Sequence, residues 1–130
     1  MDKRISILVN YLDSYDIEPE LRKTYPDIEQ GIYLFGAGIY GELVSLHLIK
    51  KGIILKGVID NDQEKQGGLC NGIPIIPFSQ IRNEQPNICI TTADKNGKNI
   101  EKQILGKYPD AVILTLRNMV ERLQEKGTIF

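Results

Sequence analysis

The sequence predicts an α/β protein built on a mostly parallel sheet of five strands, in the order 3-2-1-4-5, with helices on both faces. Two observations lead to this prediction. Short apolar runs typical of buried strands alternate along the chain with segments of helical periodicity, and this alternation favours a parallel sheet covered on both faces. A glycine-rich turn follows the first apolar run, and such a turn with right-handed crossovers is typical of that strand order.

The first part of the chain is expected to add a helix to this sheet. In residues 2–15 the apolar side chains recur with helical spacing and predict an amphipathic helix, through Ile5, Leu8, Val9 and Leu12. Residues 16–30 carry prolines and several charges, and they predict a connection with one helical turn. We therefore divide the chain into an N-terminal helix with its connection, residues 1–30, and an α/β domain, residues 31–130.

The remaining elements follow from the apolar runs and their spacing. Strands are expected at residues 32–35, 53–59, 73–76, 87–92 and 111–115. Helices are expected at residues 38–51, at 78–84 as one or two turns, in a segment with Ile100, Ile104 and Leu105 that ends near Gly106, and in a last segment with Leu116, Met119, Val120 and Leu123 that ends near Gly127. The polar residues 61–72 are expected to form a loop.

Composition narrows the class of protein. A chain of 130 residues has room for one domain with a real core. The net charge of −1 gives no general attraction to nucleic acid or to acidic membranes, and no apolar run approaches the length of a membrane span. Two separated cysteines indicate a reducing compartment, so we expect a cytoplasmic protein without membrane insertion or nucleic-acid binding.

The glycine-rich turn has the spacing of a phosphate-binding turn. Gly36 allows a tight exit from the first strand, Gly38 leaves room for a diphosphate beside the backbone, and Gly41 lets the helix lie close to the sheet. The backbone N–H groups of Ile39 and Tyr40 are candidate phosphate donors, because a helix N-terminus carries unpaired N–H groups and a partial positive charge. The alternative is a βαβ unit whose glycines serve only the tight turn.

Polar residues at the ends of two other expected strands complete the candidate site. Asp60 ends the second strand 19 residues after Gly41 (60 − 41), near the usual spacing of about 20. With Asn61 it is placed to hold a ribose or a base, although the same residues also suit a simple turn. Thr91 and Thr92 follow the fourth strand, where they would line the far wall of the crevice between the first and fourth strands.

The chain offers little for catalysis. With one histidine and two separated cysteines, no metal site is expected. The sequence has no Tyr-x-x-x-Lys pair, no glycine-flanked serine nucleophile and no Gly-Lys-Ser/Thr phosphate loop. We expect a binding domain without catalytic residues of its own, and whether it belongs to an enzyme stays open.

Several segments in the same order carry a family resemblance. They are residues 35–41 (Phe-Gly-Ala-Gly-Ile-Tyr-Gly), 58–62 (Val-Ile-Asp-Asn-Asp), 65–67 (Lys-Gln-Gly), 71–76 (Asn-Gly-Ile-Pro-Ile-Ile) and 88–94 (Ile-Cys-Ile-Thr-Thr-Ala-Asp). This part of the chain resembles the N-terminal, Rossmann-like nucleotide-sugar-binding domain of the bacterial sugar O- and N-acetyltransferases that make sialic acids and modified surface sugars. It is also similar to the C-terminal Rossmann domain of sugar C-methyltransferases.

The resemblance implies a function as well as a fold. In the acetyltransferases this domain holds the nucleotide part of a UDP-sugar, while a separate β-helix of hexapeptide repeats transfers the acetyl group. These 130 residues contain no such repeats, so the resemblance implies binding rather than transfer. We therefore expect a nucleotide or UDP-sugar-binding domain of surface-polysaccharide or sugar-nucleotide metabolism, which works with a catalytic partner domain.

Two other hypotheses remain from the residues themselves. The same turn and Asp60 suit an NAD-binding oxidoreductase or redox-sensing domain, in which the carboxylate would repel the 2′-phosphate of NADP. The apolar stripe of residues 2–15 suits a scaffold or oligomerisation module without a ligand, for example a homodimer formed through the N-terminal helix.

Overall fold

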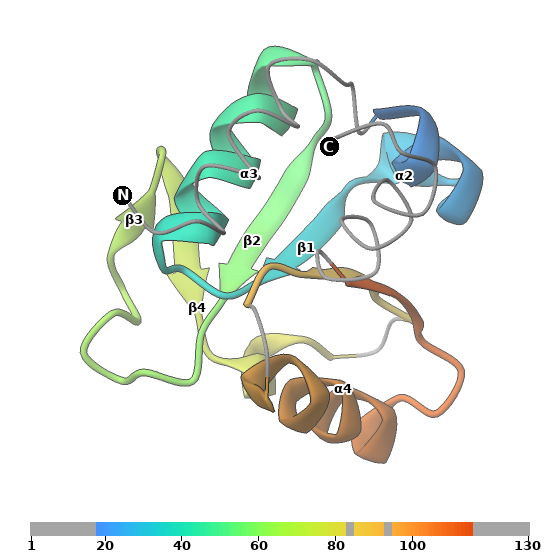
Figure 1. Ribbon diagram of the computed structural model, residues 1–130. Coiled ribbons are helices and arrows are strands. Elements are labelled where there is room, and N and C mark those ends of the chain that lie inside the picture. Colours follow the sequence, from blue (N-terminus) through green and yellow to red (C-terminus); the bar gives the residue numbers. More distant parts are fainter. Residues whose placement is uncertain (1–17, 83–84, 93–94, 116–130) are drawn as a thin grey trace.

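The computed structural model describes residues 18–82, 85–92 and 95–115 of the chain (Figure 1). The expected helices at residues 2–15 and after residue 116 lie outside this described part. In these described residues, five helical elements and six strands follow one another in a mostly alternating order. They are α2 (Glu18–Thr24), the 3₁₀ helix η1 (Ile28–Gln30), β1 (Ile32–Phe35), α3 (Ile39–Lys50), β2 (Leu55–Ile59), β3 (Leu69–Cys70), β4 (Ile73–Ile76), the 3₁₀ helix η2 (Phe78–Gln80), β5 (Asn87–Ile90), α4 (Lys95–Lys107) and β6 (Val112–Thr115).

The strands form one sheet in the order β3-β4-β2-β1-β5-β6. The five expected strands correspond to β1, β2, β4, β5 and β6, and they pair in parallel with one another. The expected count of five is wrong, because β3 adds a sixth, antiparallel strand beside β4 at the edge. The α/β class with a mostly parallel sheet is confirmed.

β3 exists because two residues of the expected loop form a tight hairpin. Asn71 and Gly72 connect β3 to β4, and both have positive φ angles, of 51° and 84°. Positive φ at both central residues is the geometry of a type I′ turn, which Asn-Gly favours and which matches the twist of two paired strands. The side chain of Asn71 also donates hydrogen bonds to the Glu42 carbonyl, at 2.7 Å, and to Ser45 Oγ, at 2.8 Å. The hairpin is thereby fixed to α3.

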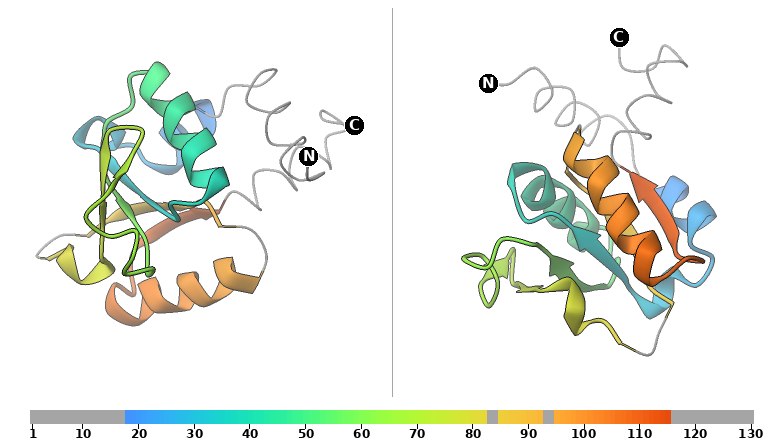
Figure 2. Two further views of the ribbon diagram at one scale, coloured as in Figure 1. Left: turned by 90° about the vertical axis from the view of Figure 1, so that its left-hand side faces the viewer. Right: turned by 90° about the horizontal axis from the view of Figure 1, so that it is seen from below.

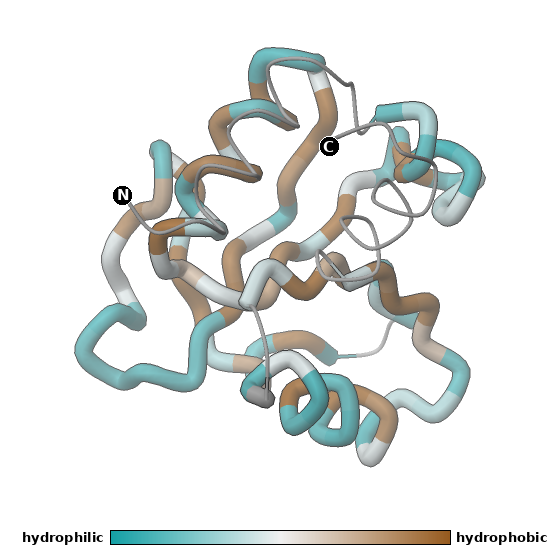
Figure 3. The backbone as a smooth tube through the Cα atoms, in the orientation of Figure 1, coloured by the Kyte–Doolittle hydropathy of each residue, from teal (hydrophilic) through white to brown (hydrophobic). Residues whose placement is uncertain are grey.

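Helices cover both faces of the sheet (Figure 2). On one face α3 and α2 pack through Val44, Leu48 and Leu21, while on the other α4 and η2 pack through Ile104 and Phe78. The central strands are apolar, and the loop between β2 and β3 is hydrophilic (Figure 3). None of the helices in the described part is both long and apolar enough to span a membrane.

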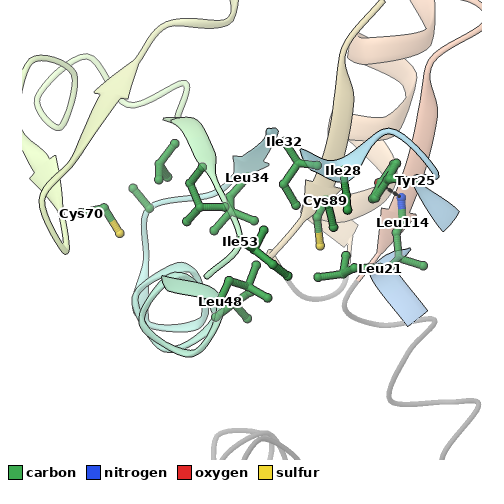
Figure 4. Close-up of a cluster of buried hydrophobic side chains, with 14 of the residues drawn as sticks. Leu21, Tyr25, Ile28, Ile32, Leu34, Leu48, Ile53, Cys70, Cys89 and Leu114 are labelled. Atoms are coloured by element: carbon green, nitrogen blue, oxygen red, sulfur yellow. Dashed lines mark hydrogen bonds between the residues drawn. The ribbon is translucent and has the colours of Figure 1, made fainter. Parts of the chain in front are cut away.

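The segment before β1 is part of the same core (Figure 4). The buried hydroxyl of Tyr25 donates a hydrogen bond to the Ile88 carbonyl, at 2.6 Å, and accepts one from the Leu114 N–H, at 3.0 Å. It therefore joins neighbouring strands β5 and β6, and burial raises the pKa of Tyr25 far above its usual value. Burial also raises the pKa of the adjacent Cys89 thiol, to about 12, so this cysteine is neutral and inert at neutral pH.

Candidate functional site

The predicted site residues meet at the edge of the sheet where β1, β2 and β5 end. The turn that starts at Gly36 joins β1 to α3, Asp60 follows β2, and Thr91 and Thr92 follow β5. Because these strands are adjacent and parallel, their carboxyl ends lie side by side. The structure thus brings together three segments that are far apart in the sequence.

Two of the three glycines are required by the packing of this turn. Gly36 has a φ of +126°, and a Cβ there would lie 2.7 Å from Thr91 Oγ1 and 2.8 Å from Thr92 Cγ2. A Cβ on Gly41 would overlap the carbonyl oxygen of Gly36. These positions account for their glycines by the fold alone, whether or not a ligand binds.

Gly38 is different, because no steric contact with the described residues requires a glycine there. Its φ of −83° is accessible to any residue, and a Cβ there would meet no atom of the described residues within 4 Å. It is the N-cap of α3, and no side chain makes a capping hydrogen bond to the first turn of this helix. Serine, threonine, asparagine and aspartate cap a helix with their side chains at this position, whereas glycine, which is also common there, has none. Among the described residues, therefore, no side chain caps the N-terminal end of α3.

The first turn of α3 presents its backbone more than its side chains. Ile39 is 56 % exposed, and the half-buried Tyr40 packs its ring against the core. The N–H groups of the first turn have no acceptor within the helix, because their partners would lie before its start. With the positive end of the helix dipole they form a place suited to an anion.

Asp60 faces this turn and holds it in place. One carboxylate oxygen accepts a hydrogen bond from the Ala37 N–H, at 2.8 Å, and the other accepts one from the Asp62 N–H, also at 2.8 Å. Its backbone carbonyl accepts a further bond from Gln66 Nε2, at 2.9 Å. Asp60 therefore stabilises the turn, as one interpretation of the sequence expected, and it can still bind a ribose, as the other expected. A carboxylate offers about four acceptor positions, so two remain for a ligand hydroxyl.

Asn61 is engaged elsewhere. Its amide forms two reciprocal hydrogen bonds with Gln103 of α4, at 2.9 and 3.1 Å, on the surface of the protein. A ribose or base could use this amide only after the pair opened. Gln103 was not predicted from the sequence, because no periodicity indicates a contact across 42 residues.

The two threonines differ in what they contribute. Thr91 is buried, and its hydroxyl lies 2.8 Å from the Gly36 carbonyl oxygen, to which it donates a hydrogen bond. Thr91 therefore stabilises the Gly36 turn through this buried hydrogen bond and does not line the crevice where a ligand would bind. Thr92 is partly exposed, and its buried hydroxyl oxygen has no hydrogen-bond partner in the described structure. Thr92 is thus the better candidate for contact with a ligand.

No other chemical centre emerges from the described residues. Among them, no group of three or more histidine, cysteine or acidic side chains could hold a metal ion. A small depression of about 90 Å³ lies at the opposite edge of the sheet, between α2 with η1 and the loop after α3, lined by Arg22, Ile28, Glu29, Gly52, Ile53 and Ile54.

Comparison with protein families and with curated proteins finds no match.

Proposed function

We propose that the chain is a Rossmann-like domain that binds a nucleoside diphosphate compound, of the UDP-sugar class, between the ends of β1, β2 and β5. The observation that carries this proposal is Gly38. No contact with the described residues requires a glycine at this end of α3, and a side chain there would extend into the space that a diphosphate would need. A diphosphate needs such a close approach to the backbone.

Each part of the ligand has a complementary group. The diphosphate would accept hydrogen bonds from the N–H groups of Gly38 and Ile39. The free acceptor positions of Asp60 would receive ribose hydroxyls, and the hydroxyl of Thr92 would bond to phosphate or sugar oxygen. In this arrangement the Asp60 carboxylate holds the turn through the Ala37 and Asp62 N–H groups and receives the ligand, so its role is one of binding. We therefore propose a binding role in the cytoplasm, within surface-polysaccharide or sugar-nucleotide metabolism and beside a catalytic partner.

NAD binding is the second candidate, and the position of Asp60 favours it. NAD shares the diphosphate and the ribose with UDP-sugars, so the same groups would hold it, while the carboxylate would disfavour a 2′-phosphate. The scaffold hypothesis rests on residues 2–15, which lie outside the described part of the chain.

Titration of the full chain distinguishes these functions. Isothermal calorimetry would compare UDP, UDP-N-acetylglucosamine, NAD⁺, NADP⁺ and inorganic pyrophosphate at one salt concentration. Saturable binding of the UDP compounds, with NAD⁺ much weaker, supports the proposal. Binding of NAD⁺ alone would replace it with the second candidate. If none of the five bound, a nucleotide site at this edge would be refuted.

A further inference from the structure

The turn between β3 and β4 consists of an asparagine followed by a glycine, a pair that is prone to lose the side-chain amide as ammonia. In this reaction the backbone nitrogen of Gly72 bonds to Asn71 Cγ, the Cγ–Nδ2 bond breaks, and the Gly72 amide proton leaves with the ammonia. The succinimide ring that results takes up water at one of its two carbonyls and opens to aspartate or isoaspartate. A glycine in second place favours ring closure because it has no Cβ to obstruct the ring. Water is the one reactant that the chain does not supply itself.

The amide that would be lost is the group that attaches the hairpin to α3. Asn71 Nδ2 donates hydrogen bonds to the Glu42 carbonyl oxygen, at 2.7 Å, and to Ser45 Oγ, at 2.8 Å. A carbonyl oxygen only accepts hydrogen bonds, so the atom that faces it must be a donor. A carboxylate at position 71 has no hydrogen to donate, and its charge would lie against the Glu42 carbonyl oxygen. Deamidation would therefore replace an attractive contact with α3 by a repulsive one.

The hairpin is weakly held against local opening. Ring closure requires rotation about the Cα–C bond of the asparagine, so the turn must open before the reaction can occur. β3 pairs with β4 through two residue pairs, and Pro74, in one of them, has no N–H to donate. Leu69 is 68 % exposed, and both residues of the turn are exposed as well. Figure 1 shows β3 at the outer edge of the sheet, beside α3. Short, exposed edge elements of this kind open at a low free-energy cost.

A second asparagine-glycine pair, Asn96-Gly97, lies in a different environment. Both of its residues belong to the first turn of α4, which packs on the sheet through the buried Ile100 and Ile104. Gly97 is itself buried, and a Cβ there would lie 3.3 Å from the Thr92 carbonyl oxygen. Ring closure at this pair would require a turn of a packed helix to unwind. Opening should therefore cost more free energy here than at the hairpin.

We propose that Asn71 is a site of spontaneous deamidation in the folded protein, and that the reaction releases the β3–β4 hairpin from α3. The chemistry is slow compared with opening and closing of the turn, so its rate follows the population of the open hairpin. The product lacks the donor that held the hairpin closed, and isoaspartate also adds a carbon atom to the backbone of the turn. Because the ammonia has left, the hairpin cannot regain its attachment.

Peptide mapping of the full-length chain, incubated at pH 8 and 37 °C, would measure the reaction at both asparagine-glycine pairs. Each rate is divided by the rate of the same site in concentrated urea, which removes the influence of neighbouring residues. We expect the fold to slow the reaction of Asn96 at least about tenfold more than that of Asn71, which corresponds to about 1.4 kcal/mol in the cost of opening. A smaller difference, or stronger slowing at Asn71, would overturn the proposed site.

Hydrogen exchange would measure the release of the hairpin. The reporters are the N–H groups of Gly67 and Ile75, which donate to the Ile75 and Gly68 carbonyl oxygens, each at 2.9 Å. In the variant Asn71→Asp, which is the aspartate product, both should exchange about two- to tenfold faster, as the loss of one hydrogen bond predicts. The matched control Asn96→Asp makes the same change of charge in the first turn of α4, where a carboxylate is favourable, and should leave both rates unchanged. Wild-type rates in Asn71→Asp, or equally fast exchange in both variants, would overturn the release.

Discussion

Replacing Gly38 by valine separates the fold from the proposed ligand. The backbone of Gly38, with φ −83° and ψ −162°, is extended and open to a β-branched residue. A Cβ there meets no atom of the part of the chain that the structure describes within 4 Å. The N-cap change from glycine to an apolar residue should lower the free energy of unfolding by about 1 kcal/mol at most. The Gly38→Val protein should therefore fold normally.

The effect on binding should be much larger. The valine side chain would occupy the space through which a diphosphate reaches the N–H groups of Gly38 and Ile39. A hydrogen bond to a charged group contributes about 1.5–3 kcal/mol, so losing two would cost about 3–6 kcal/mol. Since about 1.4 kcal/mol corresponds to a factor of ten, the dissociation constant should rise by about 100-fold or more.

Calorimetry with a UDP-sugar and thermal unfolding would be measured on the same preparations. Gly106→Val is the matched control, because Gly106 lies in the last turn of α4 and a Cβ there also meets nothing within 4 Å. The control should keep both affinity and stability. A folded Gly38→Val protein that bound as tightly as the wild type would refute the proposed approach of the ligand to this turn.

Three further predictions concern stability. Asp60→Ala removes the carboxylate that accepts hydrogen bonds from the Ala37 and Asp62 N–H groups. It should lower the free energy of unfolding, measured by urea titration, by about 1–3 kcal/mol. Unchanged stability would show that neither hydrogen bond contributes. Asn71→Ala should lower the midpoint of thermal unfolding more than Asn71→Gly, because the left-handed backbone at this position costs a non-glycine residue about 1–2 kcal/mol. The reverse ranking would contradict the assignment of a type I′ turn between β3 and β4. The pKa of Cys89 is about 12 in the folded state against 9.0 when unperturbed, so the unfolded chain loses this proton first and stability should fall as the pH rises above 9.0. Denaturant titrations at pH 8 and 10 check this loss, and it should be smaller in Cys89→Ala.

Much of the sheet could be predicted from local patterns. β1 and β4 have the expected bounds, because short apolar runs bounded by glycine or proline are reliable strand signals. β2 starts two residues later than expected, since the exposed Ile54 precedes it. β3 was missed although its signal was present: Asn71-Gly72 between Cys70 and Ile73 is a hairpin turn, but the polar residues before it favoured a loop.

The candidate site was less accessible to prediction. The spacing of Gly36 and Gly41 follows from backbone geometry, which sequence patterns describe well. The contacts of Asp60 with Ala37 and of Thr91 with Gly36 span 23 and 55 residues, and no local pattern specifies such side-chain pairs. The sequence therefore indicated where polar groups gather, but not that Thr91 and part of Asp60 support the turn.

The hydrogen bonds of the Tyr25 hydroxyl bear on the order in which the sheet can form during synthesis. Its hydrogen-bond partner at Leu114 leaves the ribosome 89 residues later, on the last strand of the sheet. Until β6 has been synthesised, the Tyr25 hydroxyl can donate its hydrogen bond to Ile88 but cannot accept the one from Leu114. Completion of the sheet is therefore delayed until almost all of its strands have been translated, as is typical of folds closed by distant contacts.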